Sequence, residues 1–225
     1  MDNLSKSDVF NGLTNEQYTK IIKTGFPKRL GPKSMLFHQG DPAEKCYLVN
    51  QGRLKLSKIN EHGKEVIIRY AGAGELTAAV AVLKNGKYPV TAQSIEKTEV
   101  IQWDKSTIID LMHRYPDIAI NMLNILLENI DDLQHRYLEL CSEHVEQRIA
   151  RSLLRLMRRA GSKTLNGILI DIPLSRENVA DYSGTTLYTV SRTLRSWEKK
   201  GWVRSARERI TITDPHALVS FAENR

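Results

Sequence analysis

Apolar and polar residues alternate over short stretches between Leu30 and Trp103. Arg53–Ile59 shows this alternation, which is typical of strands that bury one face, and Val66–Tyr70 is a further strand-like segment. Glycines recur between these stretches at intervals of 12, 11 and 11 residues: Gly40, Gly52, Gly63 and Gly74. Short strands separated by turns at this spacing predict an antiparallel β-roll, or jelly roll. Such a roll can be purely structural, or its interior can form a cavity for a small molecule.

Helical patterns lie on both sides of this region. Residues 1–25 are expected to form a short helical lead-in. Thr14 can cap a helix there, Gln17 stands where a capping box needs it, and Gly25 ends the helix. A second short helix is predicted over residues 104–115, and it ends before Pro116 because a proline ring disfavours continuation of the helix.

A much longer helix is predicted to begin at Asp117 and to reach His144. At a rise of 1.5 Å per residue it would be about 40 Å long. Its apolar positions recur in steps of three and four residues: Leu123, Leu126, Ile130, Leu133, Tyr137, Leu140 and His144. This seam could pack on the chain's own β-roll. A narrow a/d pattern over about three heptads instead favours a coiled-coil homodimer, formed through the six positions before His144.

Two short helices joined by a tight turn are predicted within Ser175–Gly201. Ser175 can cap the first helix, and Gly184 suits the turn between the two. Thr185 or Thr186 can cap the second helix, which is expected to end before Gly201. This arrangement is typical of a helix-turn-helix.

The second of these helices presents two kinds of side chain on different faces. Apolar residues at helical spacing are predicted to point inward: Leu187, Val190, Leu194 and Trp197. Side chains that can contact nucleic acid share another face: Tyr188, Ser191, Arg192 and Arg195. Because arginine pairs with guanine in the major groove, we expect a DNA recognition helix in which Arg192 reads a guanine. The alternative is an ordinary helical hairpin with a solvated basic face.

The segments around these helices complete a predicted winged helix. A basic amphipathic helix over residues 146–160 and a strand from Ile168 precede them, and strands at Trp202–Arg204 and Arg209–Thr213 follow. The predicted DNA-contacting residues are Arg176, Thr186, Tyr188, Ser191, Arg192, Arg195, Arg204 and Arg207. The wing arginines, Arg209 included, are expected to contact phosphates rather than bases.

The charge of the chain is concentrated in this region. The formal net charge is +7. Residues 1–144 contain 18 Lys and Arg against 18 Asp and Glu, whereas residues 145–225 contain 15 against 8. Phosphate neutralisation by the C-terminal third would therefore give salt-dependent affinity for nucleic acid.

Several classes of protein are not expected from this sequence. Cys46 and Cys141 are the only cysteines, too few for a disulfide framework or an iron–sulfur cluster. No apolar run approaches a membrane span, and Met1–Ser5 lack signal-peptide character, so a soluble cytoplasmic protein is expected. No Ser-His-Asp set, P-loop or paired-carboxylate motif stands out, so no enzymatic activity is assigned.

Short motifs along the chain resemble those of the bacterial CRP/FNR transcription regulators. They are Gly40-Asp41, Tyr47, Gly52, Arg148-Ile149-Ala150, Thr189–Leu194 and the closing Gly201. The resemblance implies an α+β protein of three parts. These are a cyclic-nucleotide-binding-like β-roll sensor over residues 1–116, a long dimerisation helix and hinge over 117–144, and a winged helix-turn-helix over 145–225. It also implies a homodimer that binds a palindromic double-stranded DNA site, contacts RNA polymerase and responds to a small-molecule effector.

The sequence departs from the cyclic-AMP-binding members of this family. Their Gly-Glu pair falls near Ala78-Ala79 here, and their phosphate-clamping Arg-Ser pair falls near Tyr88-Pro89. A cyclic phosphate would lose its bidentate arginine, so cyclic AMP is not expected. The positions on the long helix that contact the adenine base in the cyclic-AMP-binding members correspond to Leu133 and Gln134 here. The cavity residues proposed for an unidentified effector are Ala79, Tyr88, Leu133 and Gln134. The N-terminal cysteine cluster of the iron–sulfur branch is also absent.

Two alternatives stay open at this point. A haem-based gas-sensing regulator of the same family would use His113 or His135, the best placed histidines on the helices that flank the roll. A cupin-like metalloenzyme would use His38 and His62, which stand apart without a His-x-His arrangement. The effector could equally be an organic acid or an aromatic compound.

Because family members commonly carry glutamate at the position of Tyr188, a different base preference is expected there.

Overall fold

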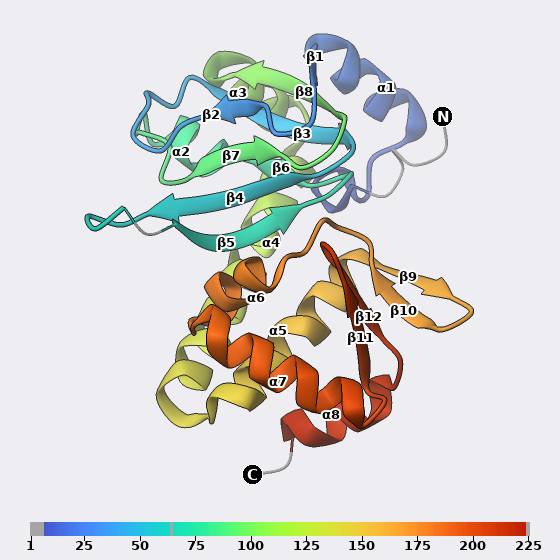
Figure 1. The fold of residues 1–225 in the computed structure, drawn as a ribbon. Helices are drawn as coiled ribbons and strands as arrows, with labels where there is room; N and C mark the ends of the chain where they lie inside the picture. The colour runs from blue at the N-terminus through green and yellow to red at the C-terminus, as the bar shows by residue number, and fades with distance from the viewer. Residues whose placement is uncertain (1–6, 64, 224–225) are drawn as a thin grey trace. The chain divides into compact units, whose positions relative to one another are not determined.

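A computed structural model describes residues 7–63 and 65–223 of the chain (Figure 1). The chain divides into two compact units, Met1–Asp132 and Leu133–Arg225. The expectation concerning a signal peptide rests on Met1–Ser5, which lie outside the described residues.

The N-terminal unit begins with a short 3-10 helix, Asp8–Phe10, and α1, Asn15–Thr24. The predicted capping box is present in α1: the amide of Gln17 donates to Thr14 Oγ1 at 3.2 Å, and the amide of Thr14 donates to Gln17 Oε1 at 2.8 Å. Two backbone donors that the helix itself cannot satisfy are thereby paired, which explains why α1 starts there.

Two antiparallel sheets of four strands form the body of this unit, with strand orders β1-β8-β3-β6 and β2-β7-β4-β5. The strands are β1 Phe26–Leu30, β2 Met35–Phe37, β3 Lys45–Gln51, β4 Leu54–Ile59, β5 Glu65–Ala71, β6 Leu76–Thr77, β7 Thr91–Ser94 and β8 Thr98–Asp104. Buried residues of both sheets, among them Leu48, Leu54 and Trp103, belong to one hydrophobic core. The predicted β-roll is confirmed.

Gly52 shows why the turns of the roll need glycine. Its φ is +83°, and a Cβ atom there would lie 2.5 Å from the carbonyl oxygen of Lys97. Any other residue would therefore combine backbone strain with a clash against the backbone beside β8.

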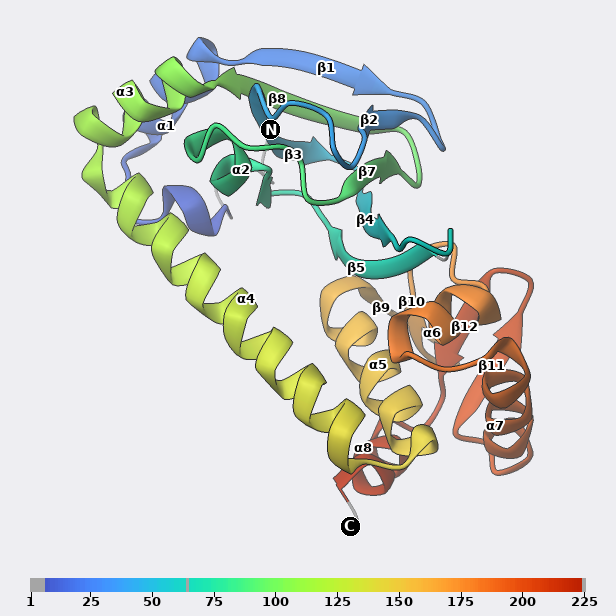
Figure 2. The same cartoon turned by 90° about the vertical axis from the view of Figure 1, so that its left-hand side faces the viewer.

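Three helices follow or interrupt the strands. The short α2, Ala79–Leu83, was not anticipated, whereas α3, Lys105–Arg114, matches the predicted helix and is capped by Asp104. The long helix α4, Pro116–Ser142, starts in the N-terminal unit and ends in the C-terminal one (Figure 2). It stops two residues earlier than expected because His144 is the N-cap of the next helix. His144 is therefore not a member of the helical seam.

The C-terminal unit contains a four-stranded sheet and four helices that follow α4. They are α5 Val145–Ala160, β9 Gly161–Thr164, β10 Gly167–Ile170, α6 Arg176–Ser183, α7 Leu187–Lys199, β11 Val203–Ala206, β12 Arg209–Ile212 and α8 Pro215–Glu223. The sheet order is β11-β12-β10-β9. The winged helix-turn-helix is confirmed, while β9 and α8 were not anticipated.

The core of this unit explains the orientation of α7. Val190, Leu194 and Trp197 are buried as predicted, and Trp197 contacts the ring of Phe221 from α8 at 5.6 Å. Leu187 is half exposed, so the prediction that it points inward is wrong. Leu187 is the first residue of the helix, whereas the buried residues of α7 begin at Val190.

Candidate nucleic-acid interface and effector pocket

The turn between α6 and α7 is built by local hydrogen bonds. Ser175 Oγ accepts from the amide of Asn178 at 3.0 Å, and Asn178 Oδ1 accepts from the amide of Ser175 at 3.0 Å. Gly184 ends α6 with φ +64°, and its amide donates to the carbonyl of Ala180. Thr186 Oγ1 accepts from the amide of Thr189 at 3.2 Å, so Thr186 caps α7. The capping predicted from sequence is confirmed, with Thr186 rather than Thr185 as the cap.

The outer face of α7 carries four of the predicted DNA-contacting residues together. Tyr188, Ser191, Arg192 and Arg195 line one open groove on this helix. Tyr188 is 76% exposed, and both arginines are exposed. Side chains this free can reorient toward base edges without breaking the core beneath them.

Arg192 has an acidic neighbour that the sequence did not reveal. Its guanidinium lies 3.5 Å from Glu146 in the first turn of α5. The two side chains are 64% and 36% exposed, so the pair is loose and solvent-screened. Glu146 and Arg192 are far apart in sequence, and no local pattern signals their contact.

The other predicted contacts are divided between the helix-turn-helix and the wing. Arg176 donates to Ser205 Oγ at 2.8 Å and lies 3.6 Å from Glu198, so it links α6 to α7 and β11. Arg204 on β11 and Arg207 in the turn after it are exposed. Arg176 therefore has a structural role besides any contact with DNA.

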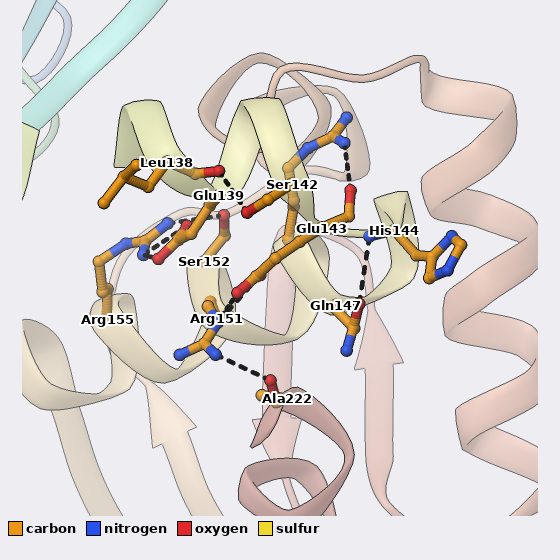
Figure 3. A network of polar contacts seen from close by, with 11 residues as sticks. Leu138, Glu139, Ser142, Glu143, His144, Gln147, Arg151, Ser152, Arg155 and Ala222 are labelled. Atoms are coloured by element: carbon orange, nitrogen blue, oxygen red, sulfur yellow. Dashed lines mark hydrogen bonds and ion pairs between the residues drawn. The ribbon is translucent and has the colours of Figure 1, made fainter. Parts of the chain in front are cut away.

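A network of arginines joins the end of α4 to α5 (Figure 3). Arg155 Nη1 donates to both carboxylate oxygens of Glu139, at 2.6 and 2.9 Å. Arg151 pairs with Glu143 at 2.9 Å and donates to the carbonyl of Ala222 at 3.0 Å. These residues were not singled out from the sequence, because their spacing matches that of an ordinary basic helix.

Two further arginines in this unit hold the helix-turn-helix itself. Arg148 donates to the carbonyl of Glu143 at 3.1 Å and to that of Gly184 at 3.4 Å. The guanidinium of Arg136 lies 4.7 Å from the ring centre of Tyr182, which is buried in α6. The end of α4, the start of α5 and the turn before α7 are thus connected by charged side chains.

The predicted dimerisation residues form an exposed apolar row on α4. Their exposed fractions range from 37% to 67% for Leu123, Leu126, Ile130, Leu133, Tyr137 and Leu140. Large apolar side chains arranged in a row of this kind mark an interaction surface more often than isolated exposed ones do.

The N-terminal unit contains a pocket of about 220 Å³. Ala79 and Tyr88, two of the four predicted effector residues, line it. Leu133 and Gln134 are not among the lining residues, because α4 reaches the pocket only through Met122–Asn129. The single chain therefore does not bring the four predicted residues together.

The histidines considered as haem or metal ligands lie outside this pocket. His38, His62, His113 and His135 are all exposed, and none of them lines the pocket. Within residues 7–63 and 65–223 no group of three His, Cys, Asp or Glu side chains could hold a metal ion. Of the helices described, none is long and apolar enough to cross a membrane.

Comparison with known proteins gives two domain matches. Residues 27–115 match the model of the cyclic nucleotide-binding domain, and residues 147–221 match the Crp-like helix-turn-helix domain. Together the two matches span more than half of the chain.

Individual relatives cover nearly the whole chain. The CRP-like cAMP-activated global transcriptional regulator of Mycobacterium tuberculosis is 20% identical over 97% of this chain and 98% of its own. The transcriptional activator protein anr of Pseudomonas aeruginosa is 27% identical over 90% of this chain and 82% of its own. The structure of the c-di-GMP-responsive global regulator CLP of Xanthomonas campestris aligns with a TM-score of 0.77, at 18% identity, over 88% of this chain and 99% of that one, and so shares its fold. The chain belongs to the CRP/FNR family of DNA-binding transcription regulators.

Proposed function

We propose that this regulator acts as a homodimer that places two copies of α7 in successive major grooves of a palindromic DNA site. The outer face of α7 supports the proposal. Tyr188, Arg192 and Arg195 are exposed there and line one groove with half-buried Ser191, on a helix that its N-cap and core hold in place. With α7 in the major groove, Arg192 donates to O6 and N7 of a guanine.

The remaining contacts follow from charge and position. Arg195 and the exposed wing residues Arg204 and Arg207 are placed to neutralise phosphates, and Thr186 and Arg176 approach the backbone at the ends of their helices. The excess of seven positive charges in residues 145–225 supplies the sequence-independent part of the affinity. Tyr188 offers a hydroxyl and a ring edge rather than a carboxylate, so its base preference differs from that of a glutamate.

The exposed row on α4 supports the homodimer. A second copy of the same helix would cover the apolar side chains between Leu123 and Leu140. We assign residues 1–116 to sensing, 117–144 to dimerisation and the hinge, and 145–225 to DNA binding. The regulator would work in the cytoplasm together with RNA polymerase. Named relatives respond to cyclic AMP or to c-di-GMP, and we infer that an effector of the N-terminal unit likewise controls this protein.

Selection of bound sequences from random duplexes tests the DNA proposal. We expect enrichment of one two-fold symmetric sequence that contains a guanine whose recognition depends on Arg192. Arg192→Ala should weaken binding by about 1–3 kcal/mol and relax that position alone. Arg158→Ala, which removes the same charge from the exposed side of α5, is the control and should leave sequence preference unchanged. Failure to enrich any sequence over random DNA would contradict the proposal.

Sedimentation of the purified protein tests the dimer. Leu133→Glu places a charge in the exposed row and should convert the dimer to a monomer. Leu165→Glu is the matched control, since Leu165 is fully exposed in the turn between β9 and β10. Equal effects of the two variants would exclude the α4 row as the interface.

A further inference from the structure

The pocket of the N-terminal unit indicates what kind of molecule it can hold. This inference rests on the proposed function, because it names the ligand class of the sensor. Fifteen of the eighteen lining residues are apolar or aromatic. They come from β2, β4, β5, β6, α2, the segment 88–90 and α4, together with Val9, and so enclose the space from several sides.

The size of the pocket limits the ligand. A dry apolar cavity of ~150 Å³ accommodates benzene, so about 220 Å³ accommodates roughly ten non-hydrogen atoms. A cyclic mononucleotide contains a purine, a ribose and a phosphate, and is larger than this. The chain matches a cyclic nucleotide-binding domain in fold, but a cyclic mononucleotide would exceed this space and extend out through its open side.

The charge of the wall also disfavours an anion. Arg69 is the only charged residue that lines the pocket among those described. Its side chain is 17% exposed, and its guanidinium is paired with the carboxylate of Glu75. Glu75 in turn accepts a hydrogen bond from the amide of Gly72 at 3.2 Å, so the turn between β5 and β6 holds it in place. A ligand phosphate would have to displace a fixed carboxylate to reach its only cation.

Tyr88 closes one side of the pocket without offering a polar group to it. Its ring stacks on Phe37 with centroids 4.0 Å apart. Its hydroxyl donates to the carbonyl of Lys45 at 2.8 Å and accepts from the amide of Lys45 at 3.1 Å. Both hydrogen-bonding functions of the hydroxyl are therefore engaged with the backbone, and only the apolar ring faces a ligand.

Two neutral polar side chains complete the lining. Thr77 on β6 carries a hydroxyl, and Asn129 on α4 carries a carboxamide whose nitrogen donates to the carbonyl of Ile125 at 2.8 Å. Such groups can pair with one hydroxyl or carbonyl of a ligand, but they do not compensate a net charge.

We propose that this pocket binds a compact, uncharged and mainly apolar molecule, such as an alkylated phenol, and not a cyclic nucleotide. Met122, Ile125 and Leu126 of α4 line the pocket, and Leu126 also belongs to the exposed apolar row of that helix. Occupation of the pocket therefore changes the packing of the helix that carries the proposed dimer surface.

Titration calorimetry of the full chain tests the proposal with two probes that share a para-ethylphenyl group, para-ethylphenol and para-ethylbenzoate, and with cyclic AMP. At pH 7 the phenol is neutral and the benzoate is an anion. We expect the phenol to bind once per chain, the benzoate to bind at least tenfold more weakly, and cyclic AMP not to bind. Arg69→Gln should change the phenol affinity by less than twofold, as should the control Arg29→Gln on β1.

A second experiment fills the pocket with a larger side chain. Ala79→Leu should weaken the phenol at least tenfold, and Val80→Phe, at a partly exposed position on the rim, serves if that variant does not fold. Tighter binding of benzoate or cyclic AMP that is lost in Arg69→Gln would overturn the proposal, as would no binding of any probe. The same preparation is assayed for DNA binding. A protein that binds DNA but none of the probes as expected contradicts the ligand class alone, whereas a protein that does not bind DNA contradicts the proposed function.

Discussion

The ion pair between Glu139 and Arg155 allows a quantitative test of how the end of α4 is held on α5. The side chains are only 10% and 11% exposed, and one guanidinium nitrogen contacts both carboxylate oxygens. Glu139→Gln keeps the shape of the side chain and removes its charge. Arg155 then loses the carboxylate of Glu139 while its side chain stays largely buried, and breaking a buried pair in this way typically costs about 3–5 kcal/mol. We expect the lower end of this range because the site is not completely dry.

Urea denaturation of the C-terminal unit measures this cost. Trp197 and Trp202 both lie in that unit, whereas Trp103 belongs to the N-terminal unit and bonds there to Thr24. Fluorescence in a Trp103→Phe background therefore follows the unit that contains the ion pair. The midpoint should fall for Glu139→Gln without a change in the slope of the transition.

Glu143→Gln is the matched control. It removes the same charge near the end of α4, but the pair of Glu143 with Arg151 is 19% and 34% exposed. Solvent screening should limit its cost to about 1 kcal/mol. The double variant Glu139→Leu with Arg155→Met should recover most of the lost stability, since a buried pair can be replaced by apolar packing. A cost for Glu139→Gln no larger than that for Glu143→Gln would refute this reasoning.

Four shorter predictions concern other parts of the chain. Ser175→Ala should destabilise the C-terminal unit by about 1 kcal/mol, because the capping box of α6 is lost, and the same denaturation assay measures it. Burial raises the pKa of the Cys46 thiol to about 12, so iodoacetamide at pH 8 should leave it intact while exposed Cys141 is alkylated; peptide masses showing labelled Cys46 in the native protein would be the contrary result. The hydrogen bond from the Thr107 amide lowers the pKa of Asp104, so its contribution is present above the unfolded value of about 4 and is lost as the pH falls through the folded value; Asp104→Asn should flatten the acid dependence of Trp103 fluorescence, and an unchanged profile would count against it. Glu146→Gln should free Arg192 and raise DNA affinity severalfold at low salt, whereas Glu223→Gln on α8 should not, and equal effects in a binding assay would show that the ion pair is irrelevant.

The sequence alone determined the features that depend on neighbours within a few residues. Alternation of apolar residues gave the strands of the β-roll, and helical spacing gave α3, α4 and the buried face of α7. The caps at Thr14, Ser175 and Thr186 could be predicted because a cap side chain accepts a hydrogen bond from an amide three residues away. Short or weakly patterned elements were missed: α2 has only five residues, and β9 begins directly after a helix.

Only the tertiary structure decided which distant side chains meet. The pairs of Glu139 with Arg155 and of Glu146 with Arg192 join residues whose separation along the chain carries no period. Burial of Tyr88 and the pairing of Arg69 with Glu75 likewise follow from how the sheets close, and they determine the polarity of the pocket. Periodicity indicates which face of an element is apolar, but not how far a neighbour covers that face. For this reason the exposure of Leu187 was not predicted. Contacts of this kind depend on packing in three dimensions, and a one-dimensional pattern contains no record of them.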